Sequence, residues 1–255
     1  MERWRVLNLE THSAHRNMAI DEAVLRHVSS GKAPNTIRFY RWHPSAVSIG
    51  YFQSLQEEVD VDYCGQSGIG IVRRITGGGA VYHDFKGEVT YSVILRERDS
   101  RIPSDILASY PVLCEGIVGG LRSFGLTAEF RPINDILVNG MKISGNAQTR
   151  RQGVILQHGT ILADLDISTM FRALKVPKEK ISDKMIKAVE ERVTSVKREL
   201  GSSPPFEDVA ERVRKGFEDA LRIETYEGSL TDSEESVARG LEESKYRSRD
   251  WNYRR

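Results

Sequence analysis

The stretch RRITGGGAVYHD, residues 73 to 84, carries the strongest signal in the sequence, with two arginines followed by three consecutive glycines. A Walker A loop needs Lys-Ser/Thr after its last glycine, and a dinucleotide fingerprint needs a helix there, but Ala80-Val81 follows. The stretch therefore predicts a strand, a glycine turn and a second strand. The N–H groups of such a turn, with Arg73 and Arg74 at its mouth, can bind a phosphate or carboxylate. The alternative is a hairpin turn with solvated arginines.

Length and composition indicate one large domain with a proper core. The 255 residues carry 37 Lys+Arg against 36 Asp+Glu, so no overall charge marks a nucleic-acid binder. Cys64 and Cys114 are the only cysteines, which excludes a disulfide scaffold and a cysteine-rich zinc site. The six histidines lack metal-ligand spacing, so no protein-held metal is predicted. No apolar run approaches the roughly 18 residues of a membrane span, and we expect a cytoplasmic protein with no membrane association.

Short strands and helices alternate along the first two-thirds of the chain. Gly/Pro punctuation and apolar patterning predict strands at 36–40, 46–50, 70–74, 80–84, 88–95, 135–140, 141–145 and 153–164. A helix is predicted over 18–28 with Asn17 as its N-cap, and another over 111–124 ending at Gly125. From about residue 180, helical periodicity takes over at 181–196, 206–221 and 231–243, the last with a Thr231–Glu234 capping box. The pattern predicts an α/β (α+β) fold, a mixed sheet flanked by helices, with a helical C-terminal section.

Two further motifs place polar residues in strand-like segments. NGMKISGNAQ, residues 139–148, carries Lys142, a compact cation that suits a carboxylate or an α-phosphate. Taken alone, Lys142 is more often an exposed strand lysine. ILQHGTILAD, residues 155–164, sets His158 between apolar residues, where a hydrogen-bonded core histidine is the more common arrangement.

In their order along the chain, RRITGGGAVYHD (73–84), INDILVNGMKISGNAQ (133–148) and QHGTILAD (157–164) resemble the lipoate-protein ligase family. NMAIDEA, FYRWHPSAVSIGYFQ and the segment from SDKMIKAVEERVTSV to SRDWNYRR extend the resemblance over nearly the whole chain. The GRGRxGR run of the biotin branch is absent. The resemblance implies the catalytic-domain fold that biotin- and lipoate-protein ligases share, as one domain over residues 1–255.

The resemblance implies a two-step reaction. Lipoate and Mg²⁺-ATP form lipoyl-AMP, and a lysine of a lipoyl-domain protein then attacks the acyl carbon. Such acceptors include the E2 subunits of 2-oxoacid dehydrogenases and the glycine cleavage H protein. Lys142 matches the family's essential lysine, which contacts both the lipoyl carboxylate and the α-phosphate.

The same resemblance assigns further residues to two binding sites. The nucleotide or lipoyl-AMP site comprises Arg74, Gly77, Gly78, Gly79, Ala80, Val81, Tyr82, His83, Lys142 and Ala147. The lipoate pocket comprises Trp42, Lys142, His158 and Gly159, with Ile49 and Val81 as further candidates for its apolar wall.

One alternative belongs to another reaction class. Cysteine-dependent octanoyltransferases share this fold, and GEVTYS (87–92) and RQGVILQHG (151–159) favour them. Ligases of the family more usually have Gly-Asn where this chain has Gly87-Glu88. Those transferases use a thiol shortly before the lysine strand, but no cysteine follows Cys114, which we expect to be a buried small residue. A carrier that has lost catalysis is a third possibility, and the retained Lys142 argues against it.

The C-terminal end carries a prediction of its own. In single-chain ligases resembling this one, a Trp-Asn segment precedes an accessory domain, but only three residues follow Trp251-Asn252 here. We expect the accessory domain to be absent and a small second polypeptide to replace it. A frayed, self-sufficient tail is the alternative.

Overall fold

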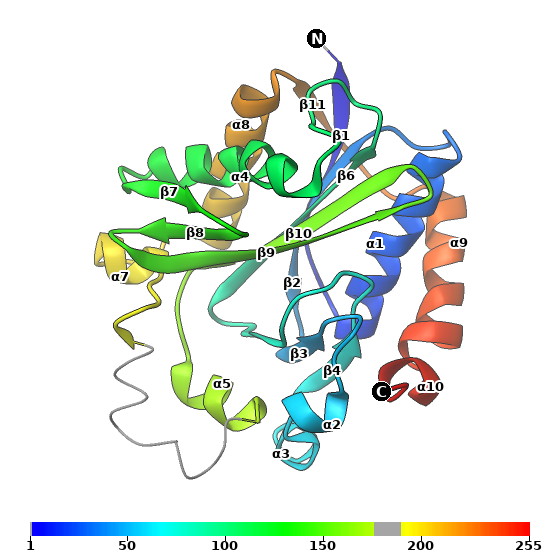
Figure 1. The fold of residues 1–255 in the computed structure, drawn as a ribbon, viewed down its shortest axis with the longest axis vertical. Coiled ribbons are helices and arrows are strands. Elements are labelled where there is room, and N and C mark those ends of the chain that lie inside the picture. The colour runs from blue at the N-terminus through cyan, green and yellow to red at the C-terminus, as the bar shows by residue number, and fades with distance from the viewer. Residues whose placement is uncertain (1, 176–189) are drawn as a thin grey trace.

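The computed structural model describes residues 2–175 and 190–255, and its strands form two sheets (Figure 1). The large sheet has the order β11-β1-β2-β6-β10-β9-β8-β7. Its strands are β1 (Arg3–His12), β2 (Thr36–Trp42), β6 (Glu88–Arg96), β7 (Ala128–Arg131), β8 (Asp135–Val138), β9 (Met141–Arg151), β10 (Val154–Leu162) and β11 (Glu224–Gly228). The small sheet, in the order β4-β3-β5, contains β3 (Ala46–Ile49), β4 (Gly70–Arg73) and β5 (Val81–His83). The predicted mixed sheet is confirmed, and the strands around the glycine turn form a sheet of their own.

Helices cover both faces of the large sheet (Figure 1). On one face α4 (Ile106–Arg122) packs against α8 (Phe206–Leu221), and on the other α1 (Ala14–Ser29) packs against α9 (Asp232–Leu241). The α4–α8 contact is so close that a Cβ at Gly216 would lie 2.1 Å from the carbonyl oxygen of Gly116. The remaining elements are α2 (Leu55–Glu58), α3 (Val61–Gln66), α5 (Ile167–Ala173), α7 (Val196–Leu200), the π-helix η2 (Glu242–Tyr246) and α10 (Arg249–Asn252).

Helices α1 and α4 both begin earlier than the sequence predicted. The N-cap of α1 is Ser13, whose side chain accepts a hydrogen bond from the N–H of Arg16, so the prediction of Asn17 was wrong. Asn17 lies inside the helix, and its amide bonds the Arg41 carbonyl and the Arg38 guanidinium instead. Helix α4 starts after its N-cap Asp105, and Pro111, taken from sequence as the start, lies within it.

The C-terminal section is mostly helical, as predicted. Helix α8 has the predicted bounds, and the Thr231–Glu234 capping box opens α9. Strand β11, which the sequence analysis missed, pairs in parallel with β1 at the edge of the large sheet. Most of the predicted helix 181–196 lies outside the described residues. Its described part is not helical over 191–195, where the chain pairs with Lys142, and α7 begins only at Val196. None of the helices within 2–175 and 190–255 is long and apolar enough to span a bilayer.

The last helix, α10, is docked against the strand that carries the arginines. The guanidinium of Arg73 donates hydrogen bonds to the carbonyls of Trp251 (3.1 Å) and Asn252 (2.9 Å). The indole N–H of Trp251 donates in return to the Arg73 carbonyl at 2.8 Å. The Trp251-Asn252 segment is therefore a packed part of the domain rather than a frayed tail.

Candidate functional site

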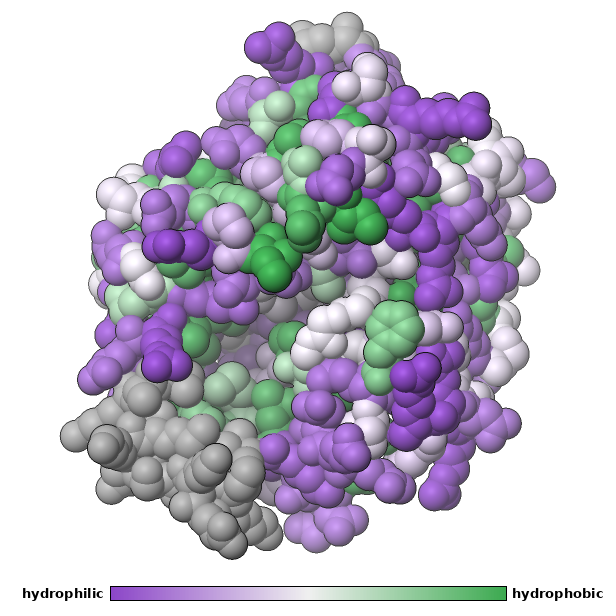
Figure 2. Space-filling view, in the orientation of Figure 1, coloured by the Kyte–Doolittle hydropathy of each residue, from purple (hydrophilic) through white to green (hydrophobic). Residues whose placement is uncertain are grey.

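A cavity of about 350 Å³ lies between the large and the small sheet. Its opening is the hollow below the β9–β10 hairpin in Figure 2. The size suits a small-molecule ligand. The three motifs that the sequence analysis singled out meet here, because the lining includes Trp42, Arg74, Gly78, Gly79, Ala80, Val81, Tyr82, His83, Lys142, Ala147, His158 and Gly159.

Two predicted residues do not line the cavity. Successive strand side chains point to opposite faces, so Ser48 on β3 faces the cavity and Ile49 is buried on the other side with Leu55 and Cys64. The assignment of Ile49 to the apolar wall was therefore wrong. Gly77 takes part only indirectly, because its carbonyl accepts a hydrogen bond from Arg74 at 2.7 Å.

Arg74 is a buried cation that holds the glycine turn in place. Its guanidinium donates to the carbonyls of Gly77 and Gly79 at 2.7 and 2.6 Å, to the Thr76 hydroxyl at 3.1 Å, and to the carbonyl and hydroxyl of Ser48. No described carboxylate lies within ion-pair distance of it. Burial lowers the pKa of Arg74 to about 10, so the group stays charged at neutral pH. The cavity wall therefore carries a positive charge without a counter-ion.

Arg73 does not stand at the mouth of the glycine turn, and that prediction was wrong. It follows the alternation of β4 and points away from the cavity, into the contact with α10. It also donates to the carbonyls of Gly50 (3.0 Å) and Gln53 (2.6 Å). Its role in this structure is to join the C-terminus to the loop that follows β3.

The glycine turn packs tightly against the loop after β3. Gly78 has φ +88°, a left-handed conformation that favours glycine. A Cβ at Gly50 would lie 2.0 Å from the carbonyl oxygen of Gly78. Backbone packing therefore excludes a side chain at Gly50 and fixes the turn at the cavity wall, whereas a Cβ at Gly77 or Gly79 would meet no atom within 4 Å.

Lys142 lies on β9 at the other side of the cavity. Its Nζ forms an ion pair with Asp135 Oδ1 at 2.6 Å, and its side chain is 41% exposed. Its backbone pairs with the segment that leads to α7, through bonds to the Arg192 carbonyl (2.7 Å) and the Thr194 N–H (2.8 Å). Lys142 is therefore held at its backbone and by one carboxylate, while its ammonium remains open to the cavity.

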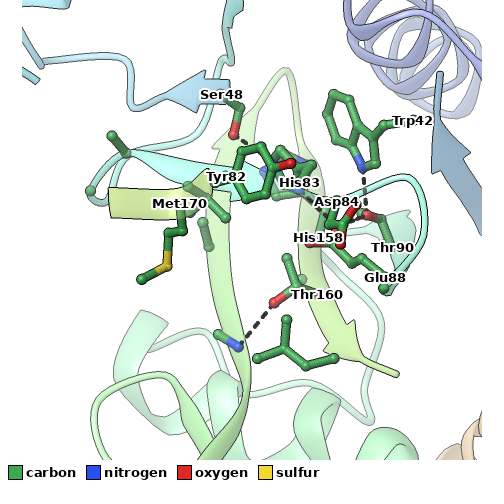
Figure 3. Close-up of a pocket in the computed structure, with 18 of the residues that line it drawn as sticks. Trp42, Ser48, Tyr82, His83, Asp84, Glu88, Thr90, His158, Thr160 and Met170 are labelled. Atoms are coloured by element: carbon green, nitrogen blue, oxygen red, sulfur yellow. Dashed lines mark hydrogen bonds and ion pairs between the residues drawn. The ribbon is translucent and has the colours of Figure 1, made fainter. Parts of the chain in front are cut away.

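Three side chains form a hydroxyl–imidazole–carboxylate chain that we call the Ser48 relay (Figure 3). Ser48 Oγ lies 2.8 Å from His83 Nε2, and His83 Nδ1 lies 2.7 Å from Glu88 Oε1. Trp42 stacks on the His83 ring, with centroids 4.0 Å apart and planes 14° apart. The Trp42 indole N–H donates to Thr90 Oγ1 at 2.7 Å, and Thr90 Oγ1 donates to Glu88 Oε1 at 2.5 Å. Ser48, His83 and Glu88 all line the cavity.

A second chain of the same kind, the Thr76 relay, lies beside the first. Thr76 Oγ1 is 2.7 Å from His158 Nε2, and His158 Nδ1 is 3.3 Å from Asp21 Oδ2. Asp21 also accepts hydrogen bonds from Arg38 at 2.9 Å and Ser92 at 2.8 Å. His158 lines the cavity, but Thr76 and Asp21 do not. The relay links α1 through β10 to Arg74 and the glycine turn.

Carboxylates gather at one end of the cavity. Asp84, Asp164 and Asp166 all line it together with Glu88. Burial, followed by the charges of Asp166, Glu88 and Asp164, raises the pKa of Asp84. Within the described residues no group of three or more His, Cys, Asp or Glu side chains has the arrangement of a metal site. The carboxylate end of the cavity therefore suits a cation that is bound to the ligand better than a cation that the protein alone would coordinate.

Neither cysteine belongs to the described lining of the cavity. Cys114 is buried in α4 against the large sheet, and burial raises the pKa of its thiol to about 12. Cys64 is buried beneath the small sheet, where burial raises the pKa of its thiol to about 11. Both are poor nucleophiles at neutral pH, because the thiolate is the reactive form.

Sequence reasoning missed several residues that face the cavity. Ser48 gave no signal, since one serine in a strand is unremarkable in a sequence. Glu88 was noted only as a departure from the family pattern, although its spacing of five residues from His83 brings the two together through the β5–β6 turn. The Asp135 partner of Lys142 was part of the INDILVNG motif, but its role depends on the β8–β9 pairing.

Comparison with known proteins gives one family and two kinds of enzyme within it. Residues 13–218 match the model of the lipoyl protein ligase A/B catalytic domain. Octanoyltransferase LipM of Kyrpidia tusciae is 40% identical over 277 residues, covering 100% of both chains. A bi-partite lipoate protein ligase from Thermoplasma acidophilum, solved in work on its E2 lipoyl domain, has a TM-score of 0.89 and 38% identity over 99% of this chain and 97% of its own. A lipoate-protein ligase A bound with ATP has a TM-score of 0.84 and 34% identity, covering 99% of each chain.

These matches confirm the expected fold and the resemblance that the sequence motifs indicated. They include both transferases and ligases, so they establish an enzyme family that handles lipoyl or octanoyl groups and leave the source of the acyl group open. The chain belongs to the lipoyl protein ligase A/B catalytic domain family.

Proposed function

We propose that this protein is a cytoplasmic, ATP-dependent lipoate-protein ligase that converts lipoate to lipoyl-AMP and transfers the lipoyl group to a lysine of a lipoyl domain. One observation carries the proposal. Two cations, Arg74 and Lys142, line a cavity whose described lining contains no cysteine. Joining a carboxylate to a phosphate requires positive charge, whereas transfer through a thioester enzyme intermediate requires a reactive thiol.

Lys142 and Arg74 would have different roles in this reaction. Lys142 can reach an oxygen of the substrate carboxylate and of the α-phosphate, because its ammonium is open to the cavity and has one described partner, Asp135. All five N–H groups of Arg74 are already bonded within the protein. Arg74 would therefore act through its charge and by fixing the glycine turn, whose N–H groups are the more direct phosphate donors. The apolar chain of lipoate would lie along Trp42, Val81, Leu162, Leu165 and Met170.

Magnesium ion fits this cavity as part of the nucleotide complex. The carboxylates of Asp84, Asp164 and Asp166 would face an anionic nucleotide unfavourably by themselves. The raised pKa of Asp84 reflects burial together with this concentration of negative charge. A divalent cation would neutralise both the carboxylates and the phosphates, and it would supply charge stabilisation at the phosphate that reacts.

The acceptor and a second subunit are further parts of the proposal. The Thermoplasma neighbour is described as a bi-partite ligase studied with its E2 lipoyl domain. By analogy we propose a lipoyl domain as acceptor, residues 1–255 as a single catalytic domain, and a small accessory polypeptide as a partner.

The second candidate is octanoyl transfer without ATP. It is favoured by the curated relatives that span the full chain, which are named octanoyltransferases. The buried positions of Cys64 and Cys114 argue against a thiol route in this chain.

The two candidates differ in what they consume. Lipoate, Mg²⁺-ATP and a lipoyl domain should yield pyrophosphate and a lipoylated lysine, read by a phosphate-coupled assay and intact mass. We expect the chain alone to react slowly and an accessory subunit to accelerate adenylation. Product from octanoyl-carrier protein without ATP, and no pyrophosphate with lipoate even when the subunit is present, would reverse the assignment.

A further inference from the structure

The Ser48 relay has the arrangement of a nucleophile with its general base. Ser48 Oγ lies 2.8 Å from His83 Nε2, and His83 Nδ1 lies 2.7 Å from Glu88 Oε1. Both distances are typical of the hydrogen bonds in a catalytic triad. When the Nδ1–H group of His83 donates a hydrogen bond to Glu88, Nε2 carries no proton and can accept that of the Ser48 hydroxyl. The stacked Trp42 ring holds the imidazole in this orientation. All three members line the cavity in which the acyl group is proposed to bind.

The surroundings of Ser48 would stabilise the charge that develops on its oxygen. The Arg74 guanidinium donates a hydrogen bond to Ser48 Oγ at 3.1 Å. Arg74 is buried and has no described carboxylate partner, so its full charge acts in a medium of low dielectric constant. A buried cation bonded to a serine oxygen favours the alkoxide and the tetrahedral intermediate that follows attack.

Glu88 supplies the matching negative charge. Its carboxylate is buried, and His83 is its ion-pair partner among the described residues. Its second oxygen, Oε2, has no hydrogen-bond partner in the described structure. The negative charge of Glu88 lies next to His83, where it stabilises the positive charge that the imidazole takes on when it accepts the Ser48 proton.

We propose that Ser48, His83 and Glu88 form a catalytic triad through which this protein accepts an acyl group from an acyl thioester. This further activity rests on the proposed acyl site but does not need ATP. It would supply the nucleophile for octanoyl transfer that the buried cysteines do not.

The reaction consists of two successive substitutions at the acyl carbon. Ser48 Oγ attacks the thioester carbonyl, its proton passes to His83 Nε2, and an acyl ester forms while the C–S bond breaks. The thiolate leaves with the proton from His83. The acceptor lysine amine, or water in its absence, then attacks the ester, gives a proton to His83, and releases the acyl product with Ser48 re-protonated.

Octanoyl-CoA and an alkyl fluorophosphonate, which reacts irreversibly with activated serines, test the proposal on the whole chain. We expect the fluorophosphonate to label Ser48, located by peptide mass spectrometry, and octanoyl-CoA to be hydrolysed or passed to a lipoyl domain without ATP. Glu88→Gln should slow labelling by roughly 10³–10⁴-fold, since loss of the triad carboxylate leaves the imidazole in the wrong tautomer.

Two variants separate chemistry from folding. Ser48→Cys keeps the nucleophile and should give an octanoyl adduct that neutral hydroxylamine removes. Ser109→Ala removes another buried serine, on α4 outside the cavity lining, and should be labelled like the unmodified protein. Label on other residues only, or equal labelling of Ser48 in unfolded protein, would overturn the triad.

The outcomes also distinguish this proposal from the ligase assignment. Lipoate-dependent pyrophosphate release without any Ser48 adduct would refute the triad and leave the ligase standing. Ser48 acylation without pyrophosphate release would do the reverse. Absence of both would refute both.

Discussion

The Ser48 and Thr76 relays are built from the same kinds of groups but differ in their surroundings. In the Thr76 relay, Asp21 is bonded to His158, Arg38, Tyr40 and Ser92, so both of its oxygens are occupied. In the Ser48 relay, one oxygen of Glu88 has no described partner. Asp21 has a permanent cation beside it, Arg38, whereas Glu88 has only the imidazole of His83 and the hydroxyl of Thr90.

The two relays also differ in access to the cavity. The hydroxyl of Ser48 faces it, while Thr76 lies behind the glycine turn and bonds Arg74. Although burial opposes ionisation of Asp21, its hydrogen bond with His158 and the charge of Arg38 lower its pKa. A hydroxyl–imidazole–carboxylate chain is thus a rigid support where the charges are balanced and the hydroxyl is enclosed. It can supply a nucleophile and its base where the hydroxyl lines the cavity and the carboxylate has no permanent cation beside it.

The largest effect should separate the relays by stability. Asp21→Asn leaves the Arg38 guanidinium buried without a counter-charge, and we expect a loss of about 3–5 kcal/mol in the free energy of unfolding. Glu88→Gln keeps a hydrogen-bonding side chain and leaves no buried cation behind, so its cost should be nearer 1 kcal/mol. Urea unfolding of both variants measures the difference. Equal losses would show that the relays are not distinct in this way.

The second effect concerns Lys142, which belongs to neither relay. Lys142→Ala should reduce ligation by roughly 10²–10³-fold, the usual cost of removing one preorganised charge that stabilises a transition state. Lys142→Arg should also fail, because a planar fork cannot replace a compact ammonium between two oxygens. The Lys142 side chain is 41% exposed, so its removal should change the free energy of unfolding little. Lys215→Ala, on the exposed face of α8, is the control, and near-normal rates for Lys142→Ala would exclude the proposed role.

A third, smaller effect concerns Arg74, where the two relays meet. Arg74→Ala removes a positive charge from the cavity wall and the hydrogen bonds to Gly77 and Gly79 that hold the glycine turn in place. One such charge-assisted hydrogen bond contributes about 1.5–3 kcal/mol, so we expect ATP to bind about 10- to 100-fold more weakly. Calorimetric titration of nucleotide gives the affinity directly. Arg212→Ala, at the remote α8–α4 contact, should bind as the unmodified protein does. An unchanged affinity in Arg74→Ala would mean that phosphate binds elsewhere.

Much of the fold could be predicted because its local signals agree with its tertiary structure. The bounds of α8 and the capping box of α9 followed from apolar periodicity and from Thr231 and Glu234 alone. The start of α1 was misplaced because Asn17 looks like a cap in sequence, whereas its side chain serves Arg38 and Arg41 across the core. Strand β11 was missed because its pairing with β1 joins opposite ends of the chain.

The site was predictable to the extent that it lies in contiguous motifs. The glycine turn, Lys142 and His158 could each be found from a few neighbouring residues. The difference between Arg73 and Arg74 could not, because it depends on which face of β4 meets the cavity. The Ser48 relay could not be found either, since the β3–β5 pairing brings Ser48 to His83 from 35 positions away.

The smallest effect should appear in the pH dependence of stability. Burial lowers the pKa of His158 below its usual 6.5, an effect that its hydrogen bond to Asp21 only partly offsets. The unfolded chain therefore binds more protons than the folded one as the pH falls through about 6.5, and the free energy of unfolding should decrease there. Burial also lowers the pKa of His15, so His15 contributes a slope of the same sign. Urea unfolding between about pH 5 and pH 8, where His is the side chain that normally titrates, should show a reduced slope in His158→Gln and in His15→Gln. If His158→Gln kept the full slope, His158 would have to be protonated in the folded protein, and the charges of the Thr76 relay would not be balanced.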